Sequence, residues 1–178
     1  MKDPPAVDIR LQSIEQFAHA ANQFAAWATQ QEDSGAVAAR NALRHITELY
    51  LAALALPASA GSADAPDVDV DSAERNTICA NCARLPLDYY GEIFDPLTMP
   101  PPEPVVGSVA DDIADIYREV VTGLRHYRAG RTDAAVWQWT FLFQVHWGEH
   151  ATGAIRALHA WLAANEGFTT TSLNSESD

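Results

Sequence analysis

The sequence contains no uninterrupted apolar stretch of the roughly 18 residues that a transmembrane helix requires. Its first five residues, Met-Lys-Asp-Pro-Pro, also lack the basic and then apolar order of a secretory signal peptide. Both absences argue against insertion into a membrane or export across one. We therefore expect a cytoplasmic protein.

Basic residues are scarce. The chain has 11 Lys and Arg against 24 Asp and Glu, which gives a formal net charge of −13 at pH 7. A surface of that sign repels the phosphates of nucleic acids and the headgroups of anionic lipids. The charge therefore argues against a nucleic-acid or membrane partner and leaves a protein partner open.

Familiar catalytic motifs are absent as well. The sequence has no glycine-rich phosphate loop, no Gly-x-Ser-x-Gly nucleophile elbow and no His-Glu-x-x-His metalloprotease order. Its two cysteines, Cys79 and Cys82, form a lone Cys-x-x-Cys without the second pair of a four-thiolate zinc site. We expect ordinary reduced thiols, with a redox couple or a zinc site as the alternatives.

What the sequence does contain is enough apolar surface for one core. Its 178 residues are 48% hydrophobic and include five Trp, six Phe and five Tyr. We predict one helical domain over residues 1–166. The tail 167–178 is rich in Ser and Thr and has no apolar period, so it is predicted to be disordered.

Apolar residues recur at three- and four-residue steps, which is typical of amphipathic helices. Such stripes cover residues 8–29, then a run that ends at Leu56 before Pro57, and a third run that begins after Ser108. Ser108 and Asp111 form a start that resembles a capping box. The short break between the first two runs predicts an antiparallel hairpin.

The fourth helix is expected to begin near Thr132. Residues 137–147 are apolar on nearly all sides, which predicts a helix at the centre of the bundle. Gly148 and Gly153 follow, so the pattern allows either one long helix or a break and a fifth helix.

Residues 57–107 separate the second helix from the third. They hold eight of the ten prolines and nine Asp and Glu against two Arg, and no periodic element fits them. We predict a long, partly ordered acidic loop, mobile over 58–71 and packed on the helices over 85–97. The predicted fold is therefore all-α, an antiparallel up-down bundle of four to five helices with this loop between helices two and three.

The run His-Trp-Gly-Glu-His contains the clearest candidate for chemistry. His146 and His150 are four residues apart, so both imidazoles share one helical face where they could bind a divalent metal ion. Asp111, Asp112 or Asp115 could add a carboxylate if helices three and four pair antiparallel, and Asp115 lies deepest in its helix. The alternative is that both histidines are partly buried and have structural partners.

Two further spacings suggest sites. Arg156 and His159 lie together on the last helix, where we expect Arg156 to pair with Asp115 or another carboxylate across the bundle. The Arg-Asn-x-x-x-His spacing over 40–45 resembles the catalytic motif of a helical class of toxin ribonucleases. On so acidic a chain we interpret that match, at Arg40, Asn41 and His45, as chance.

Several stretches resemble the bacterial family of domain of unknown function 5063. They are residues 49–54 (Leu-Tyr-Leu-Ala-Ala-Leu), 113–117 (Ile-Ala-Asp-Ile-Tyr) and 147–148 (Trp-Gly) followed by 156–159 (Arg-Ala-Leu-His). The resemblance runs from the first helix to about Leu162 and implies a small all-helical protein without an assigned activity. The family-like stretches include Asp115, Tyr117, Arg156 and His159, and they exclude the two cysteines.

These observations favour a non-enzymatic helical-bundle protein-interaction module, monomeric or a small homo-oligomer, with an unidentified protein partner. The alternative is a metal- or small-molecule-dependent helical-bundle enzyme. No cofactor is predicted, although a divalent metal ion stays open at His146, His150 and Asp115 or at the two cysteines. The candidate site residues are Asp115, Tyr117, His146, His150, Arg156 and His159.

Overall fold

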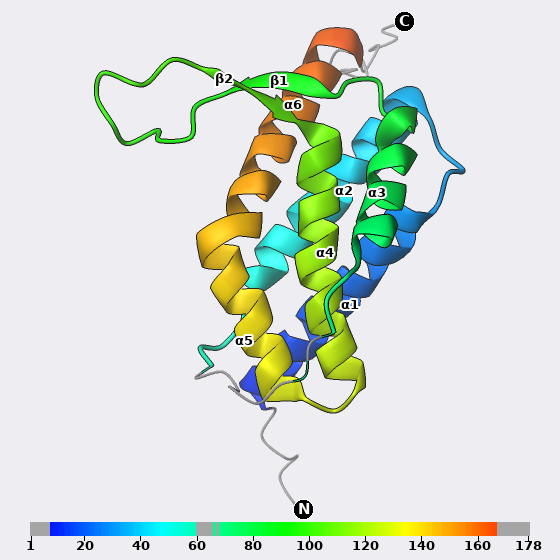
Figure 1. Cartoon of the computed structure of the whole chain (residues 1–178), viewed down its shortest axis with the longest axis vertical. Coiled ribbons are helices and arrows are strands. Elements are labelled where there is room, and N and C mark those ends of the chain that lie inside the picture. Colours follow the sequence, from blue (N-terminus) through cyan, green and yellow to red (C-terminus); the bar gives the residue numbers. More distant parts are fainter. Residues whose placement is uncertain (1–7, 60–65, 67, 167–178) are drawn as a thin grey trace, which may run out of the picture.

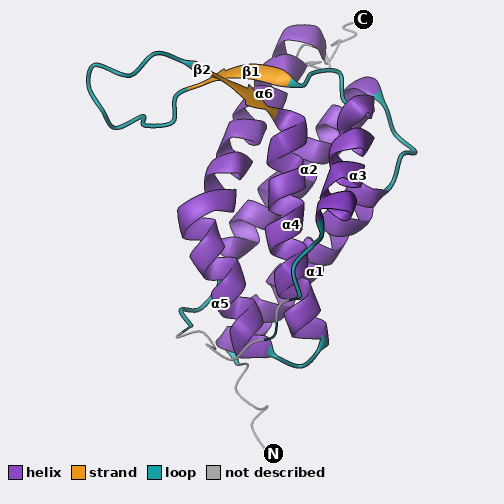
Figure 2. Cartoon of the chain, in the orientation of Figure 1, coloured by secondary structure: helices purple, strands orange, loops and turns teal. Residues whose placement is uncertain are grey.

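The structure is a computed structural model that describes residues 8–59, 66 and 68–166. Figure 2 shows that these residues form helices and one small β-hairpin, which confirms the predicted all-α class. None of the described helices is both long and apolar enough to cross a membrane. The predicted disordered tail, 167–178, lies outside the described residues.

The helices and strands follow one another along the chain with short connections at most junctions. A 3-10 turn (Cys82–Arg84) follows α3, and a π turn (Phe143–Trp147) joins α5 to α6. The elements are α1 (Ile9–Thr29), α2 (Gly35–Ala53), α3 (Ser72–Asn81), β1 (Tyr89–Glu92), β2 (Val105–Ser108), α4 (Val109–Arg128), α5 (Thr132–Leu142) and α6 (Gly148–Glu166).

Helix α4 is the central helix of the bundle. It packs against α1, α3, α5 and α6, while α2 packs against α1 and α6. Figure 1 shows that α1 and the α5–α6 run point one way, whereas α2 and α4 point the other. Because α2 ends at the opposite end of the bundle from the start of α4, the chain between them returns along the full length of the bundle.

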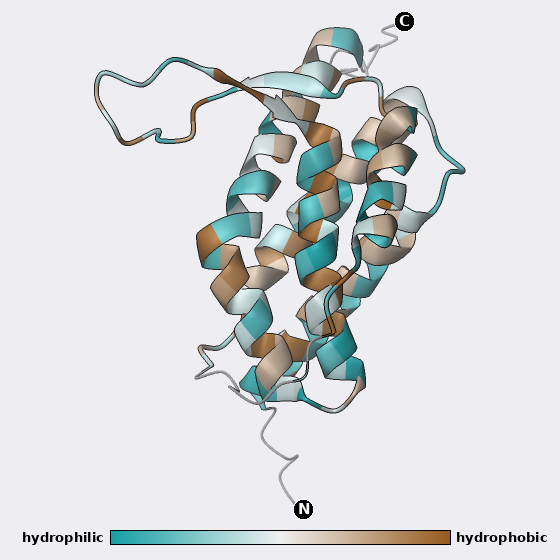
Figure 3. Ribbon diagram, viewed as in Figure 1, coloured by the Kyte–Doolittle hydropathy of each residue, from teal (hydrophilic) through white to brown (hydrophobic). Residues whose placement is uncertain are grey.

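The sequence of α4 explains its central place. Ser108 caps the helix by accepting a hydrogen bond from the backbone N–H of Asp111 at 3.2 Å, which confirms the predicted start. The apolar stripe is completely buried, and Figure 3 shows its brown residues alternating with teal ones along the helix. Its fully buried apolar members are Val109, Ile113, Ala114, Ile116, Val120 and Leu124.

The prediction that no regular element lies within 57–107 is wrong, because α3 and the β-hairpin both form there. Asp71 caps α3 by accepting from the backbone N–H of Glu74 at 2.8 Å. Ile78 is its one fully buried apolar side chain. The helix is held to α4 mainly by polar contacts, such as that between Glu74 and Arg125 at 2.6 Å. A short helix with a single buried apolar residue leaves no periodic signal.

The predicted packing of 85–97 on the helices is correct for one half only. Leu85, Leu87 and Tyr90 pack against the core, but Phe94 and Leu97 are 69% and 90% exposed. Strands β1 and β2 pair antiparallel, with Tyr89 opposite Ser108. Beyond the strands, residues 93–104 form an arm that projects away from the bundle (Figure 1).

The run predicted at the bundle centre, 137–147, is buried on one side only. Trp139 and Trp147 are fully buried, whereas Trp137, Phe141 and Val145 are 37%, 44% and 53% exposed. The expectation of an all-round buried helix is therefore wrong. The exposed aromatic side chains stack on each other instead, with ring centroids of Trp137 and Phe141 5.1 Å apart.

Candidate metal centre

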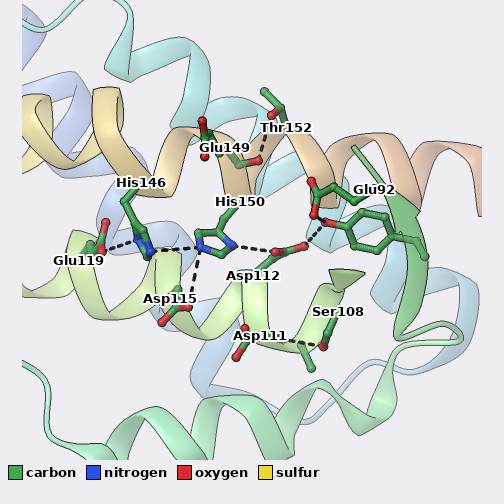
Figure 4. Close-up of polar contacts among 12 residues, drawn as sticks. Glu92, Ser108, Asp111, Asp112, Asp115, Glu119, His146, Glu149, His150 and Thr152 are labelled. Carbon is green, nitrogen blue, oxygen red and sulfur yellow. Dashed lines mark hydrogen bonds and ion pairs between the residues drawn. The ribbon is translucent and has the colours of Figure 1, made fainter. Parts of the chain in front are cut away.

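Two histidines face each other between α4 and the α5–α6 run. His146 lies in the π turn and His150 in the first turn of α6, so their four-residue spacing puts both on the side that faces α4. Their Nε2 atoms are 3.4 Å apart (Figure 4). Among the described residues, these two histidines and Asp115 form a group whose ligand atoms all lie within 4.8 Å of one another.

Each imidazole has a carboxylate of α4 behind it. Asp112 Oδ1 lies 2.8 Å from Nδ1 of His150, and Glu119 Oε1 lies 2.7 Å from Nδ1 of His146. An ionised carboxylate only accepts hydrogen bonds, so His150 keeps its proton on Nδ1, and the nearby charge of Glu119 favours the same tautomer of His146. The lone pairs of both Nε2 atoms are therefore directed into the space between the rings.

Asp115 is the third member of the group. Its Oδ2 is 3.8 Å from Nε2 of His150, while its Oδ1 accepts a hydrogen bond from Nε of Arg75 at 2.9 Å. The carboxylates Asp112, Asp115 and Glu119 follow at steps of three and four residues, which aligns them along one face of α4. Figure 4 shows this row opposite the two histidines.

Burial and pairing shift the ionisation of these groups in opposite directions. Burial raises the pKa of Asp112 and of Glu119, whose side chains are among the most buried charged groups of the protein. The hydrogen bond to Asp112 raises the pKa of His150. Burial opposes ionisation of Asp115, but the hydrogen bond and charge of Arg75 outweigh it and lower the pKa of that carboxyl. The site thus combines an imidazole whose pKa is raised with a carboxylate whose pKa is lowered.

The β-hairpin reaches this site through Tyr90. Its hydroxyl donates to Oδ2 of Asp112 at 2.8 Å and lies 3.3 Å from Oε2 of Glu92. Burial, followed by the charge of Asp112, raises the pKa of Tyr90, so the hydroxyl stays protonated. Gly153 makes this approach possible, because a Cβ at that position would collide with the Tyr90 hydroxyl and the Glu92 carboxylate.

The structure brings together three of the six predicted site residues, Asp115, His146 and His150. Tyr117 lies on another face of α4 and donates to Glu74 of α3 at 2.9 Å. The other two, Arg156 and His159, are exposed on α6. Of the six-residue cluster expected from the sequence, the two histidines and one carboxylate lie together.

The predicted pairing of Arg156 with Asp115 is wrong. Arg156 donates through Nη2 to the backbone carbonyl of Gly91 at 2.7 Å and so fastens β1 to α6. Asp115 is paired instead with Arg75, at 2.9 Å, on the helix that the sequence did not predict. Arg75 on α3 thus makes the ion pair with Asp115 that the sequence predicts for Arg156 on α6.

Three residues of the site were not selected from the sequence. Asp112 lies near the start of its helix, so the sequence pattern favours Asp115, which lies deeper in the helix, as the ligand. Glu119 lies seven residues after Asp112 on the same helical face, and that spacing opposite His146 and His150 was the available signal. Tyr90 had no such signal, because its contact depends on how the hairpin folds back.

The other predicted ligand pair, Cys79 and Cys82, consists of free thiols. Among the described residues, no third His, Cys, Asp or Glu completes a metal-ligand group with them. Burial raises the pKa of Cys82 to about 12, so its sulfur is a thiol and not the thiolate that binds metals or attacks disulfides.

Of the three residues of the ribonuclease-like spacing, Asn41 and His45 line one pocket, whereas Arg40 lies outside it. Arg40 pairs with Glu166 at the end of α6. Asn41 donates to Asp33 at 2.8 Å, and the His45 ring is stacked on Trp27 with centroids 5.7 Å apart. Within one chain, each side chain thus has a different neighbour.

Comparisons with known proteins give the family and the fold. No curated protein matches the chain. A solved structure, protein BF1032 from Bacteroides fragilis, has a similar fold with a TM-score of 0.71 and 20% sequence identity, and the match covers 84% of this chain and 92% of that one. The model of the family described as domain of unknown function (DUF5063) matches residues 9–164. The chain therefore belongs to the DUF5063 family.

Proposed function

We propose that the protein binds a divalent transition-metal ion through Nε2 of His146, Nε2 of His150 and the carboxylate of Asp115. The observation that carries the proposal is the 3.4 Å separation of the two Nε2 atoms, whose lone pairs face each other. Two imidazole nitrogens bound to zinc at about 2.0–2.1 Å with tetrahedral angles lie about 3.3 Å apart. Without a cation or a shared proton between them, two such lone pairs repel each other.

The carboxylates behind the histidines support the same function. Metal-binding histidines usually donate their second ring N–H to a carboxylate, which fixes the tautomer and makes the ligand more basic. Asp112 stands in that relation to His150. Glu119 lies at ion-pair distance from Nδ1 of His146 without good hydrogen-bond alignment, so this buried nitrogen has no hydrogen-bond partner among the described residues. A cation that turns the His146 ring toward it would improve that alignment.

The donor set indicates which ions fit. Two imidazoles and one carboxylate suit zinc, iron, nickel or cobalt, whereas magnesium and calcium prefer oxygen ligands. Three protein ligands also leave a coordination position open, as in catalytic rather than structural sites. The His146 side chain is 41% exposed, so solvent can reach this position. A divalent ion bound there would supply Lewis acidity to a water molecule, which is the chemistry of metal-dependent hydrolysis.

Zinc titration against a competing chromophoric chelator tests the proposal. The wild-type protein is expected to bind one zinc ion per chain, and His150→Ala to lose this binding. His159→Ala is the matched control, because it removes an exposed histidine from the same helix. No stoichiometric zinc, iron, nickel or cobalt binding by the wild type, or equal binding by both variants, would show that the histidine pair is structural.

The protein-interaction module expected from the sequence is the second candidate function. One observation favours it: the arm 93–104 carries exposed Phe94, Leu97 and Met99 away from the bundle. We also propose a cytoplasmic location, because free thiols such as Cys79 and Cys82 are typical of proteins in a reducing compartment.

A further inference from the structure

The arm of the β-hairpin exposes apolar side chains that the described chain leaves uncovered. Leu97, Met99 and Val106 are 90%, 79% and 76% exposed. The segment 96–102, Pro-Leu-Thr-Met-Pro-Pro-Pro, carries no charge, although the chain as a whole has a net charge of −13. Residues 96–100 form a turn followed by bends, and Asp95 stabilises its start by accepting hydrogen bonds from the backbone N–H of Leu97 and the hydroxyl of Thr98.

A second uncharged surface lies where α2 ends beside α5. It is a groove with a cavity of about 530 Å³, and every residue that lines it is uncharged. Trp137 and Phe141 form its aromatic wall, stacked at 5.1 Å with an angle of 4° between the rings, and Leu54 on the opposite helix is 62% exposed. Exposed apolar surfaces of this kind mark interaction sites.

Charge restricts what can occupy this groove. Two acidic chains repel each other wherever their charged surfaces meet, so association is favoured only between surfaces that carry no charge. The arm segment 96–102 and the groove are two such surfaces on the same chain. Figure 1 shows them on the same flank of the bundle, with the arm near one end and the α2–α5 junction near the other. A two-fold axis between the two ends would bring each arm to the other chain's groove.

From these observations we infer that two copies of this chain form a symmetric dimer in which the arm of each lies in the α2–α5 groove of the other. The inference rests on the second candidate function and names its partner. Reciprocal exchange closes the assembly at two chains, whereas a single head-to-tail contact would continue into a fibre. The arm 93–104 has 12 residues and the groove has ten, which gives 22 residues per chain, within the roughly 20 to 30 that each partner contributes to a standard interface.

Light scattering coupled to size-exclusion chromatography tests the dimer with the full chain. The wild type is expected to elute as a dimer at micromolar concentration. An arm variant (Leu97→Ser with Met99→Ser) and a groove variant (Trp137→Ser with Phe141→Ser) should each raise the dimer Kd by at least about tenfold. Val37→Ser, which removes an exposed apolar residue elsewhere, is the matched control. A monomeric wild type, or variants that dimerise like it, would overturn the inference.

Mixing the two variants separates reciprocal exchange from other dimers. The arm variant keeps an intact groove and the groove variant keeps an intact arm, so a mixed pair retains one of the two contacts. Native mass spectrometry should show the mixed dimer in excess over the proportion that random pairing of equal amounts of the two variants gives. A random distribution of the three dimers would contradict the exchange. Unchanged helicity by circular dichroism shows that the substitutions left the fold intact, which is expected because all four side chains are at least 37% exposed.

A photoreactive phenylalanine at position 97, introduced in cells, tests whether the arm binds a partner at all and whether that partner is a second copy of this chain. A product with the mass of two chains, crosslinked to the groove, supports the inference. A product with another protein overturns it while leaving the interaction function standing. A chain that stays uncrosslinked counts against both.

Discussion

Tyr90 and His150 share one carboxylate: the tyrosine hydroxyl donates to Oδ2 of Asp112 at 2.8 Å, and Nδ1 of the histidine donates to Oδ1 at 2.8 Å. Asp112 is almost fully buried, so each donor compensates part of the cost of removing its charge from water. A strand of the hairpin thereby orients a candidate metal ligand on a helix that lies about 60 residues away in sequence.

Asp112→Asn should weaken zinc binding by about 10- to 100-fold without abolishing it. The amide cannot make His150 more basic, and its NH₂ group can donate to Nδ1 and so favour the wrong tautomer. Competition with a chelator measures the change. Asp133→Asn, at an exposed carboxylate of α5 that pairs with Arg10, is the control and should retain wild-type affinity. Equal affinities for the two variants would show that Asp112 does not orient the histidine.

Gly153→Ala should weaken zinc binding, although Gly153 is not one of the proposed metal ligands. The added methyl group collides with the Tyr90 hydroxyl and must displace it from Asp112. We expect the same loss of zinc affinity as for Tyr90→Phe, less than about tenfold, and no further loss when the two changes are combined. Additive losses in this double-mutant cycle would mean that the glycine acts through something other than the tyrosine.

Zinc affinity should fall as the pH falls through the pKa of His150. That pKa is raised from 6.5, first by the hydrogen bond to Asp112. In the metal-free protein the protonated imidazole therefore contributes stability that is complete below about pH 6.5 and is lost as the pH rises through the raised value. Metal binding has the opposite dependence, because it requires the unprotonated Nε2. Titrations across this range should show a midpoint above pH 6.5 that moves down in Asp112→Asn; a midpoint that stays in place would contradict the role of Asp112.

The sequence contained the fold class, the long helices and the histidine pair, because each is a local pattern. Periodicity places Ile113 and Ile116 in the core, and a four-residue step places His146 and His150 on one face. Local patterns could not reveal which residues pair with each other across the bundle. Arg75, which takes the place assigned to Arg156, belongs to a helix held by polar contacts with α4, and such contacts leave no repeat in the sequence.

Ile78→Ala tests whether α3 is integral to the fold. This side chain is 1% exposed and packs in the main core, so its truncation should lower the free energy of unfolding by about 2–5 kcal/mol. Asn76→Ala, at an exposed position on the same helix, should change it by less than about 0.5 kcal/mol. Urea denaturation measures both. Equal midpoints for the two variants would mean that α3 is only loosely attached.

Cys82 should react slowly with iodoacetamide in the native protein. Its pKa of about 12 leaves almost no thiolate near neutral pH, and the side chain is buried, whereas Cys79 is partly exposed. Mass spectrometry of Cys79→Ser and Cys82→Ser variants compares the two thiols one at a time. The difference should disappear in urea. Faster alkylation of Cys82 than of Cys79 in the native protein would contradict the burial of Cys82.

The π turn Phe143–Trp147 rotates the side chains of α6 about the helix axis relative to those of α5. A π turn is equivalent to one residue inserted into an α-helix, and one residue corresponds to a rotation of about 100°. Gly148 accommodates the widened turn, because a Cβ there would strike the carbonyl oxygen of Phe143. A helical wheel drawn from Thr132 therefore assigns the wrong side to every residue of α6. Deleting one residue from the turn would preserve the helix but rotate His150 away from Asp112, so the register of this one turn determines whether the two halves of the candidate site can meet.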